Sequence, residues 1–152
     1  MSELNNVIKE TINELFSMFG IESNVKNEIE EDKLKSSQEI NIILGLTGDV
    51  KGSLLLGANK KIVLKIVSAM MGGMEFPEVD DIVISGISEF TNMAGGTAAT
   101  KLHNQNKSID ISPPTVVKSD NGSTIVFNSL KTHKVVYEVA GEEMTVSCCL
   151  KD

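Results

Sequence analysis

The feature that most constrains the fold is a long helical pattern in the middle of the chain, with strand patterns on both sides of it. From about Asp80 to His103, apolar residues recur at the three- and four-residue spacing of a single helix face. The residues on this face are Val83, Ile87, Phe90, Ala94 and Ala98. A stripe of this length must be covered by a sheet or by another helix, so we expect this helix to pack against the core.

Two shorter helical patterns flank the first group of strands. The first runs from about Ser2 to Phe19, with Ser2 as a candidate N-cap and Gly20 as its stop, and its apolar face comprises Leu4, Val7, Ile8, Ile12, Leu15 and Phe19. The second runs over residues 60–71, where Asn59 is a candidate N-cap and the Gly72–Met74 stretch ends the helix.

Strand patterns fill most of the remaining chain. We expect strands at residues 25–29, 38–46, 50–58, 115–118, 124–127, 133–139 and 144–150. Turn signals lie at Gly48-Asp49, at residues 120–122 and at residues 140–142. The order of helix, strands, two helices and strands predicts an α+β fold, in which an N-terminal helix and a central helix pair pack on a mostly antiparallel sheet. The 152 residues suggest one domain, 1–152.

Composition narrows the classes of function. Aromatic residues are only 4% of the chain and Trp is absent, so the core must be aliphatic. The net charge is −7 and Lys and Arg form no cluster, which argues against a nucleic-acid binder and against binding to anionic lipid. Neither a signal peptide nor an apolar run of about 20 residues is visible, so we expect a cytoplasmic protein without a membrane segment.

The metal-binding and redox residue types give little indication of a site. His103 and His133 stand alone, and most single histidines are not ligands, so we expect no metal site and no cofactor bound by this chain. Adjacent residues on a strand point to opposite faces, so we expect Cys148 and Cys149 to be one buried and one more exposed free thiol. The methionines at 70, 71 and 74 are interpreted as core filler.

The opposite face of the long helix carries a short polar column, Ser85, Glu89 and Asn92, at positions i, i+4 and i+7. A polar face opposite an apolar stripe is typical of any surface helix. However, two adjacent glycines, Gly95 and Gly96, follow Asn92, and Gly96 continues the polar face. Each glycine in the middle of a helix costs about 1 kcal/mol relative to alanine, so these two need a reason. A bare stretch beside Glu89 and Asn92 would let another surface approach closely.

This segment, SGISEFTNMAGGTAATKL from Ser85 to Leu102, resembles the active helix of the CheC/CheX/FliY family of chemotaxis phosphatases. The family signature is Asp or Ser, three residues, Glu, two residues and Asn, which Ser85, Glu89 and Asn92 match. Small residues after the Asn and a proline about twenty residues further on belong to the same pattern, and Pro113 or Pro114 stands near that place. Chain length and the N-terminal helix resemble the CheX branch.

The resemblance implies hydrolysis of the aspartyl phosphate on a CheY-type response-regulator receiver domain, which would bring its own Mg²⁺ and Lys. Asn92 would orient the attacking water, and Glu89 would pair with the receiver's Lys. Ser85, Gly95 and Gly96 would contact the partner. Members of the CheX branch form homodimers by extending the sheet, and edge strands late in this chain are consistent with that.

Three alternatives remain open from the sequence. A non-catalytic module that docks a receiver or a flagellar switch component would share the polar column, and so would a structural dimerisation domain with a plain polar surface. A second copy of the motif is also conceivable, because Glu10 and Asn13 repeat the Glu-x-x-Asn spacing and Asn6 stands where Asp or Ser belongs. Bulky residues after Asn13, including Leu15 and Phe16, are expected to hold a partner off, so we interpret this copy as chance.

Overall fold

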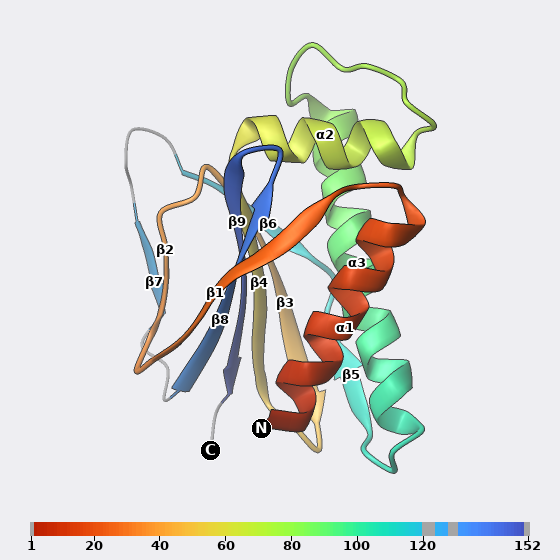
Figure 1. Cartoon of the computed structure of the whole chain (residues 1–152). Helices are drawn as coiled ribbons and strands as arrows, with labels where there is room; N and C mark the ends of the chain where they lie inside the picture. The colour runs from red at the N-terminus through yellow and green to blue at the C-terminus, as the bar shows by residue number, and fades with distance from the viewer. Residues whose placement is uncertain (1, 120–123, 128–130, 151–152) are drawn as a thin grey trace.

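A seven-stranded antiparallel sheet forms the centre of the molecule in the computed structural model of the chain (Figure 1), which describes residues 2–119, 124–127 and 131–150. Its strands lie in the order β1 (Ser23–Glu31), β8 (Lys131–Val139), β9 (Glu142–Leu150), β4 (Gly52–Ala58), β3 (Ile40–Gly48) and β5 (Ile109–Ile111), and β6 (Thr115–Lys118) also pairs with β3. A separate two-stranded sheet consists of β2 (Leu34–Ser36) and β7 (Ile125–Phe127).

The described residues also form three helices, of which α1 and α3 lie side by side next to the large sheet (Figure 1). They are α1 (Ser2–Met18), α2 (Lys60–Met70) and α3 (Asp81–His103). The main core fills the space between these helices and the sheet. The predicted α+β class, with an N-terminal helix and a central helix pair on an antiparallel sheet, is therefore confirmed.

The middle of the sheet is buried on both faces at β4, which explains an apolar run that does not alternate. In β4, Leu54 and Leu56 belong to the main core under the helices, whereas Leu55 between them packs with Leu34 of β2 in a small second cluster. The neighbouring thiols follow the same rule, because Cys148 lies in the main core and Cys149 in the second cluster. The expectation that one of the two thiols is more exposed was wrong, and burial raises the pKa of the Cys148 thiol to about 12.

Most of the predicted elements are present, with small shifts at their ends. The Gly48-Asp49 turn joins the antiparallel pair β3 and β4, and the 140–142 turn joins β8 and β9 through residues Ala140 and Gly141, whose φ angles are 52° and 77°. The turn predicted at residues 120–122 lies outside the described residues. The three-residue strands β2 and β5 were not expected.

The edges of the large sheet agree only in part with the expected edge strands late in the chain, since of these strands β6 lies at an edge. The late strands β8 and β9 lie inside the sheet, whereas β1 forms one edge and β5 and β6 pair with β3 at the other. None of the helices among the described residues combines the length and the hydropathy that a membrane-spanning segment requires.

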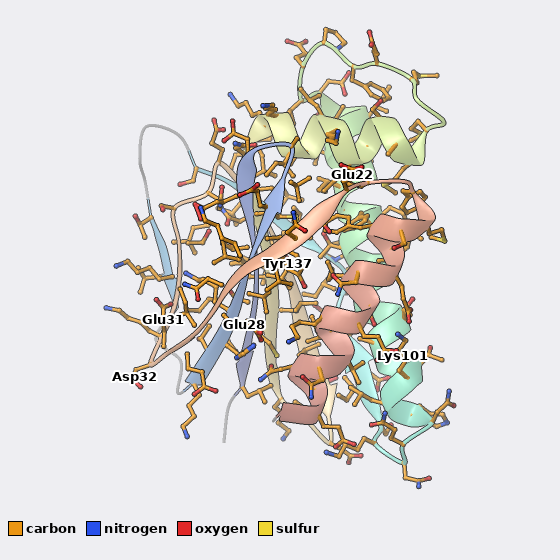
Figure 2. The ribbon with its side chains drawn as sticks, viewed as in Figure 1. Glu22, Glu28, Glu31, Asp32, Lys101 and Tyr137 are labelled. Carbon is orange, nitrogen blue, oxygen red and sulfur yellow. The ribbon has the colours of Figure 1, made fainter. Side chains whose placement is uncertain are left out.

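Ion pairs connect α1 with α3 on one side and with β1 on the other. The Lys101 ammonium of α3 donates to Glu10 and Glu14 of α1 at 3.1 and 2.8 Å, and Lys9 of α1 donates to Glu28 of β1 at 3.1 Å. Glu28 and Lys101 accordingly lie on either side of α1 in Figure 2. Burial opposes the charge of Lys101, but the hydrogen bonds to the two glutamates outweigh it and raise the pKa of Lys101.

Candidate active site on helix α3

The N-terminal end and the apolar stripe of α3 together fix which face of this helix is open. Asp80 caps the helix, since its carboxylate accepts a hydrogen bond from the Val83 amide at 2.9 Å. Further along, the ring of Phe90 stacks on Phe16 of α1 at 5.7 Å, and Phe16 in turn meets Tyr137 of β8 edge to face at 6.0 Å. The five predicted apolar positions of α3 are all buried, so the helix has a defined orientation about its axis.

The polar column of Ser85, Glu89 and Asn92 lies on the opposite, open face. Ser85 and Glu89 are exposed and Asn92 is partly buried. Their side chains make no hydrogen bond or ion pair with any other residue that the structure describes. A free carboxylate and a free amide, one helical turn apart, are therefore available to a group that approaches from outside.

The two mid-helix glycines differ in their surroundings. A Cβ built at Gly96 would meet no atom within 4 Å, so this position is a bare part of the open face, as expected. A Cβ at Gly95 would lie 2.6 Å from Leu44 Cδ1 of β3 and 3.3 Å from Ile111 Cδ1 of β5. Gly95 is buried and lets α3 approach the sheet, so its assignment to the partner-binding face was wrong.

A third glycine brings α2 against the beginning of α3. A Cβ at Gly86 would lie 2.8 and 2.9 Å from the two methyl groups of Val67, so only glycine permits this approach between the helices. Beyond this contact, α2 ends at Met70 with Met71 as its C-cap, and Gly72 and Gly73 follow with φ angles of 69° and 94°. The chain then leads to α3 through an exposed loop.

A groove opens between the end of α2 and the first turns of α3, beside the polar column. Its volume is about 400 Å³, and it is lined by Met70, Met71, Asp81, Ile82, Ser85, Gly86 and Glu89. We call these residues the α2–α3 groove. Met71 and Met74 are exposed rather than part of the core, so their interpretation as core filler was wrong. Sequence reasoning missed this groove, although the Gly72-Gly73 pair marks the place where α2 must stop.

The second Glu-x-x-Asn copy on α1 differs from the first in its contacts. Glu10 is bound by Lys101, whereas Asn13 is exposed. Leu15 and Phe16 are buried in the core, so they do not obstruct this face, and that reason for rejecting the copy was wrong. The described residues contain no group of three or more His, Cys, Asp or Glu side chains placed to hold a metal ion.

Solved structures of chemotaxis proteins share this arrangement of helices and strands. A CheC-like superfamily protein from Shewanella sp. PV-4 superposes with a TM-score of 0.87 over 100% of this chain and 99% of its own, at 19% identity. The CheX-CheY-BeF₃-Mg²⁺ complex from Borrelia burgdorferi contains a chain that matches with a TM-score of 0.72, over 99% of this chain and 97% of its own, at 20% identity. These similarities define the fold class.

Sequence comparison then identifies the family. The model of the family "Chemotaxis phosphatase CheX" matches residues 40–138, and this chain therefore belongs to that family. The "CheY-P phosphatase CheX" of Thermotoga maritima is 47% identical over 75 residues. This match covers 49% of the chain and spans about half of that relative, 48% of its length.

Proposed function

We propose that this protein is a phosphatase that hydrolyses the aspartyl phosphate of a CheY-type response-regulator receiver domain in chemotaxis signalling. The observation that carries the proposal is the open face of α3, where the unpaired Glu89 and Asn92 side chains stand beside the bare Gly96. Membership of the CheX family and the name of the Thermotoga maritima relative support the same activity.

In the proposed reaction, a water oxygen attacks phosphorus while the bond from phosphorus to the aspartyl carboxylate oxygen breaks. The products are inorganic phosphate and a free aspartate carboxylate, and the water proton is released. Asn92 suits the positioning of that water, because its amide accepts from the water and donates to a phosphoryl oxygen without bringing a negative charge. Holding the water in line contributes on the order of 10²-fold or more in rate.

Glu89 and Ser85 would act one and two turns before Asn92. Glu89 would pair with the Lys of the receiver's active site, which sets how deeply Asn92 enters. Ser85 would form a hydrogen bond at the rim of the contact. Gly96 would admit the receiver's loops, because no side chain covers the helix there.

Several further properties belong to the proposal. The receiver would supply Mg²⁺, as the BeF₃-Mg²⁺ composition of the Borrelia burgdorferi complex suggests, and the phosphatase chain would bind no cofactor of its own. We also propose that residues 1–152 act as a single domain, that the protein works in the cytoplasm and that it forms a homodimer by pairing of sheet edges.

The decay of a phosphorylated CheY-type receiver, followed with and without the protein, tests the proposal. The wild type should accelerate decay, Asn92→Ala should remove the acceleration by at least about 10²-fold, and Glu89→Ala should reduce it strongly. The Asn92→Ala variant should still bind the receiver loaded with BeF₃⁻ and Mg²⁺. This combination separates catalysis from the alternative of a module that only sequesters its partner.

Asn13→Ala is the matched control, because it removes the corresponding amide from the second copy of the motif on α1. We expect it to leave the rate unchanged, because Glu10, the acid of this second copy, is already bound by Lys101 and is not free to pair with a receiver. If wild type and Asn92→Ala gave the same decay across several receivers, the proposed catalysis would be wrong.

A further inference from the structure

Beside the polar column, the surface combines exposed apolar side chains with uncompensated acidic charge. Ile82 is 58% exposed, Met71 44% and Met74 61%, and these are three of the six large apolar side chains that stand out on the described surface. Ile82 and Met71 line the α2–α3 groove, and Met74 follows in the loop after α2. Methionine adapts its shape to a partner, so this is a surface suited to protein contact.

The charge of this region has one sign. From residue 66 to residue 100 the sequence has no Lys, Arg or His, and it has five acidic residues, Glu75, Glu78, Asp80, Asp81 and Glu89. None of the described ion pairs involves these acids. A complementary partner surface therefore presents apolar side chains accompanied by Lys or Arg.

The groove and the column are too close for a partner to cover only one of them. Ser85 and Glu89 belong to both. Ile82 precedes Asn92 by ten residues, which is about 15 Å along the helix axis. A protein interface of standard size covers about 800 Å² on each partner, which as a disc has a radius of about 16 Å. A partner centred on Asn92 therefore extends over Ile82.

We infer that the α2–α3 groove is the specificity surface for the receiver, and that it takes an apolar, Lys- or Arg-bearing segment of the receiver beside the phosphorylated aspartate. This inference rests on the proposed function, because the same partner occupies both surfaces. In this inference the column supplies the chemistry at the phosphorylated aspartate, whereas the groove contacts receiver residues outside the reacting centre. The groove thus selects the substrate.

The test compares Ile82→Ser and Met71→Ser with the wild type, using a CheY-type receiver loaded with BeF₃⁻ and Mg²⁺ for binding and the phosphorylated receiver for turnover. Each substitution should raise Kd and KM about fivefold to tenfold and leave kcat unchanged. Met71→Leu should bind the receiver like the wild type, because it keeps the apolar area that Met71→Ser removes. Kd should also rise between about 50 and about 300 mM NaCl, since the acidic rim is screened.

Val126→Ser is the matched control, because Val126 is 47% exposed and lies on β7, away from the helices (Figure 1). If both groove variants had the same Kd and KM as the wild type, the inference would be overturned. A change in their oligomeric mass without a change in receiver binding would also overturn it, and would identify a second copy of the chain as the occupant.

The two proposals fail in different ways. If the protein binds receivers without accelerating decay, and the groove variants bind more weakly, the inference about the groove would be supported and the proposed catalysis would be overturned. Normal catalysis with unaffected groove variants would overturn the groove alone. A wild type that binds no receiver would overturn both.

Discussion

The three glycines in α3 lie in three different surroundings. Gly86 admits Val67 of α2, Gly95 admits Leu44 of the sheet, and Gly96 faces outward with nothing near it. The first two let neighbouring elements approach, which offsets the cost of glycine in a helix through closer packing. Gly96 has no such compensation within the described chain, so its cost indicates a function.

Replacing Gly96 by alanine should separate stability from activity. Gly96→Ala should stabilise the fold by about 0.5–1 kcal/mol, because it removes the helix cost of glycine at an open position, yet it should raise the KM for the phosphorylated receiver. Thermal melting and the decay assay measure the two effects. Equal or better activity together with higher stability would mean that the partner does not approach this position.

The open face of the polar column was predictable from the spacing of its residues, but the burial of Gly95 was not. The spacing of Ser85, Glu89 and Asn92 placed them on one open face, because the helix period alone decides that. Gly95 lies only about 60° around the helix from Asn92, at the border of the buried face, and its side depends on where Leu44 lies. No local pattern contains that information.

At the scale of elements, length decided what could be predicted. Each helix has an apolar period over several turns, and Asn59 and Asp80 mark two of the helix beginnings, so the bounds were nearly right. The strands β2 and β5 have three residues each, which is too short to show a period, whereas the equally short β7 was predicted because its apolar residues are contiguous. The α2–α3 groove could not be predicted, since it forms where two helices cross.

Helix α1 depends on ionised carboxylates for part of its attachment to the sheet. The hydrogen bond from Lys9 is the main reason why the pKa of Glu28 lies below its ordinary value of 4.5, burial acts against it, and His133 at 3.1 Å adds to the lowering. The unfolded chain therefore binds this proton more readily than the folded chain. Glu28 stabilises the fold above about pH 4.5, and this contribution is lost as the pH falls through the lower folded-state pKa.

A pH series of melting curves should show this contribution. Glu28→Gln should lower the Tm at pH 7, and the difference from the wild type should shrink as the pH falls through the lowered folded-state pKa of Glu28, because the wild-type carboxylate then becomes protonated. Glu75→Gln, in the exposed loop after α2, is the control and should show little difference at any pH. A difference for Glu28→Gln that is independent of pH would contradict this role of its charge.

For the whole molecule, the two faces of the sheet are unequally covered. The helix side holds the large core, whereas the second cluster consists of Leu34, Leu55 and Cys149 with Ile43 packed against it. The small sheet that supplies Leu34 has three residue pairs between β2 and β7 within the described part of the chain. This side should therefore open without disrupting the main core.

Native-state hydrogen exchange should detect this opening. Amides of β2 that bond to β7 should exchange at least about 10²-fold faster than those of β4 and β9, with little dependence on denaturant. The amides of β4 and β9 should exchange only on global unfolding, because these strands lie inside the large sheet. Equal protection in both sheets would mean that β2 and β7 unfold together with the rest.

The helices that form the groove and carry the column follow one another directly, from Lys60 to His103, with every strand encoded outside that interval. Under the proposed function, recombination between related genes could therefore exchange the groove and the column together as one uninterrupted segment. Partner choice is free to diversify while the sheet beneath stays the same, provided that the residues facing Leu44 and Ile111 remain small enough to seat the new helix.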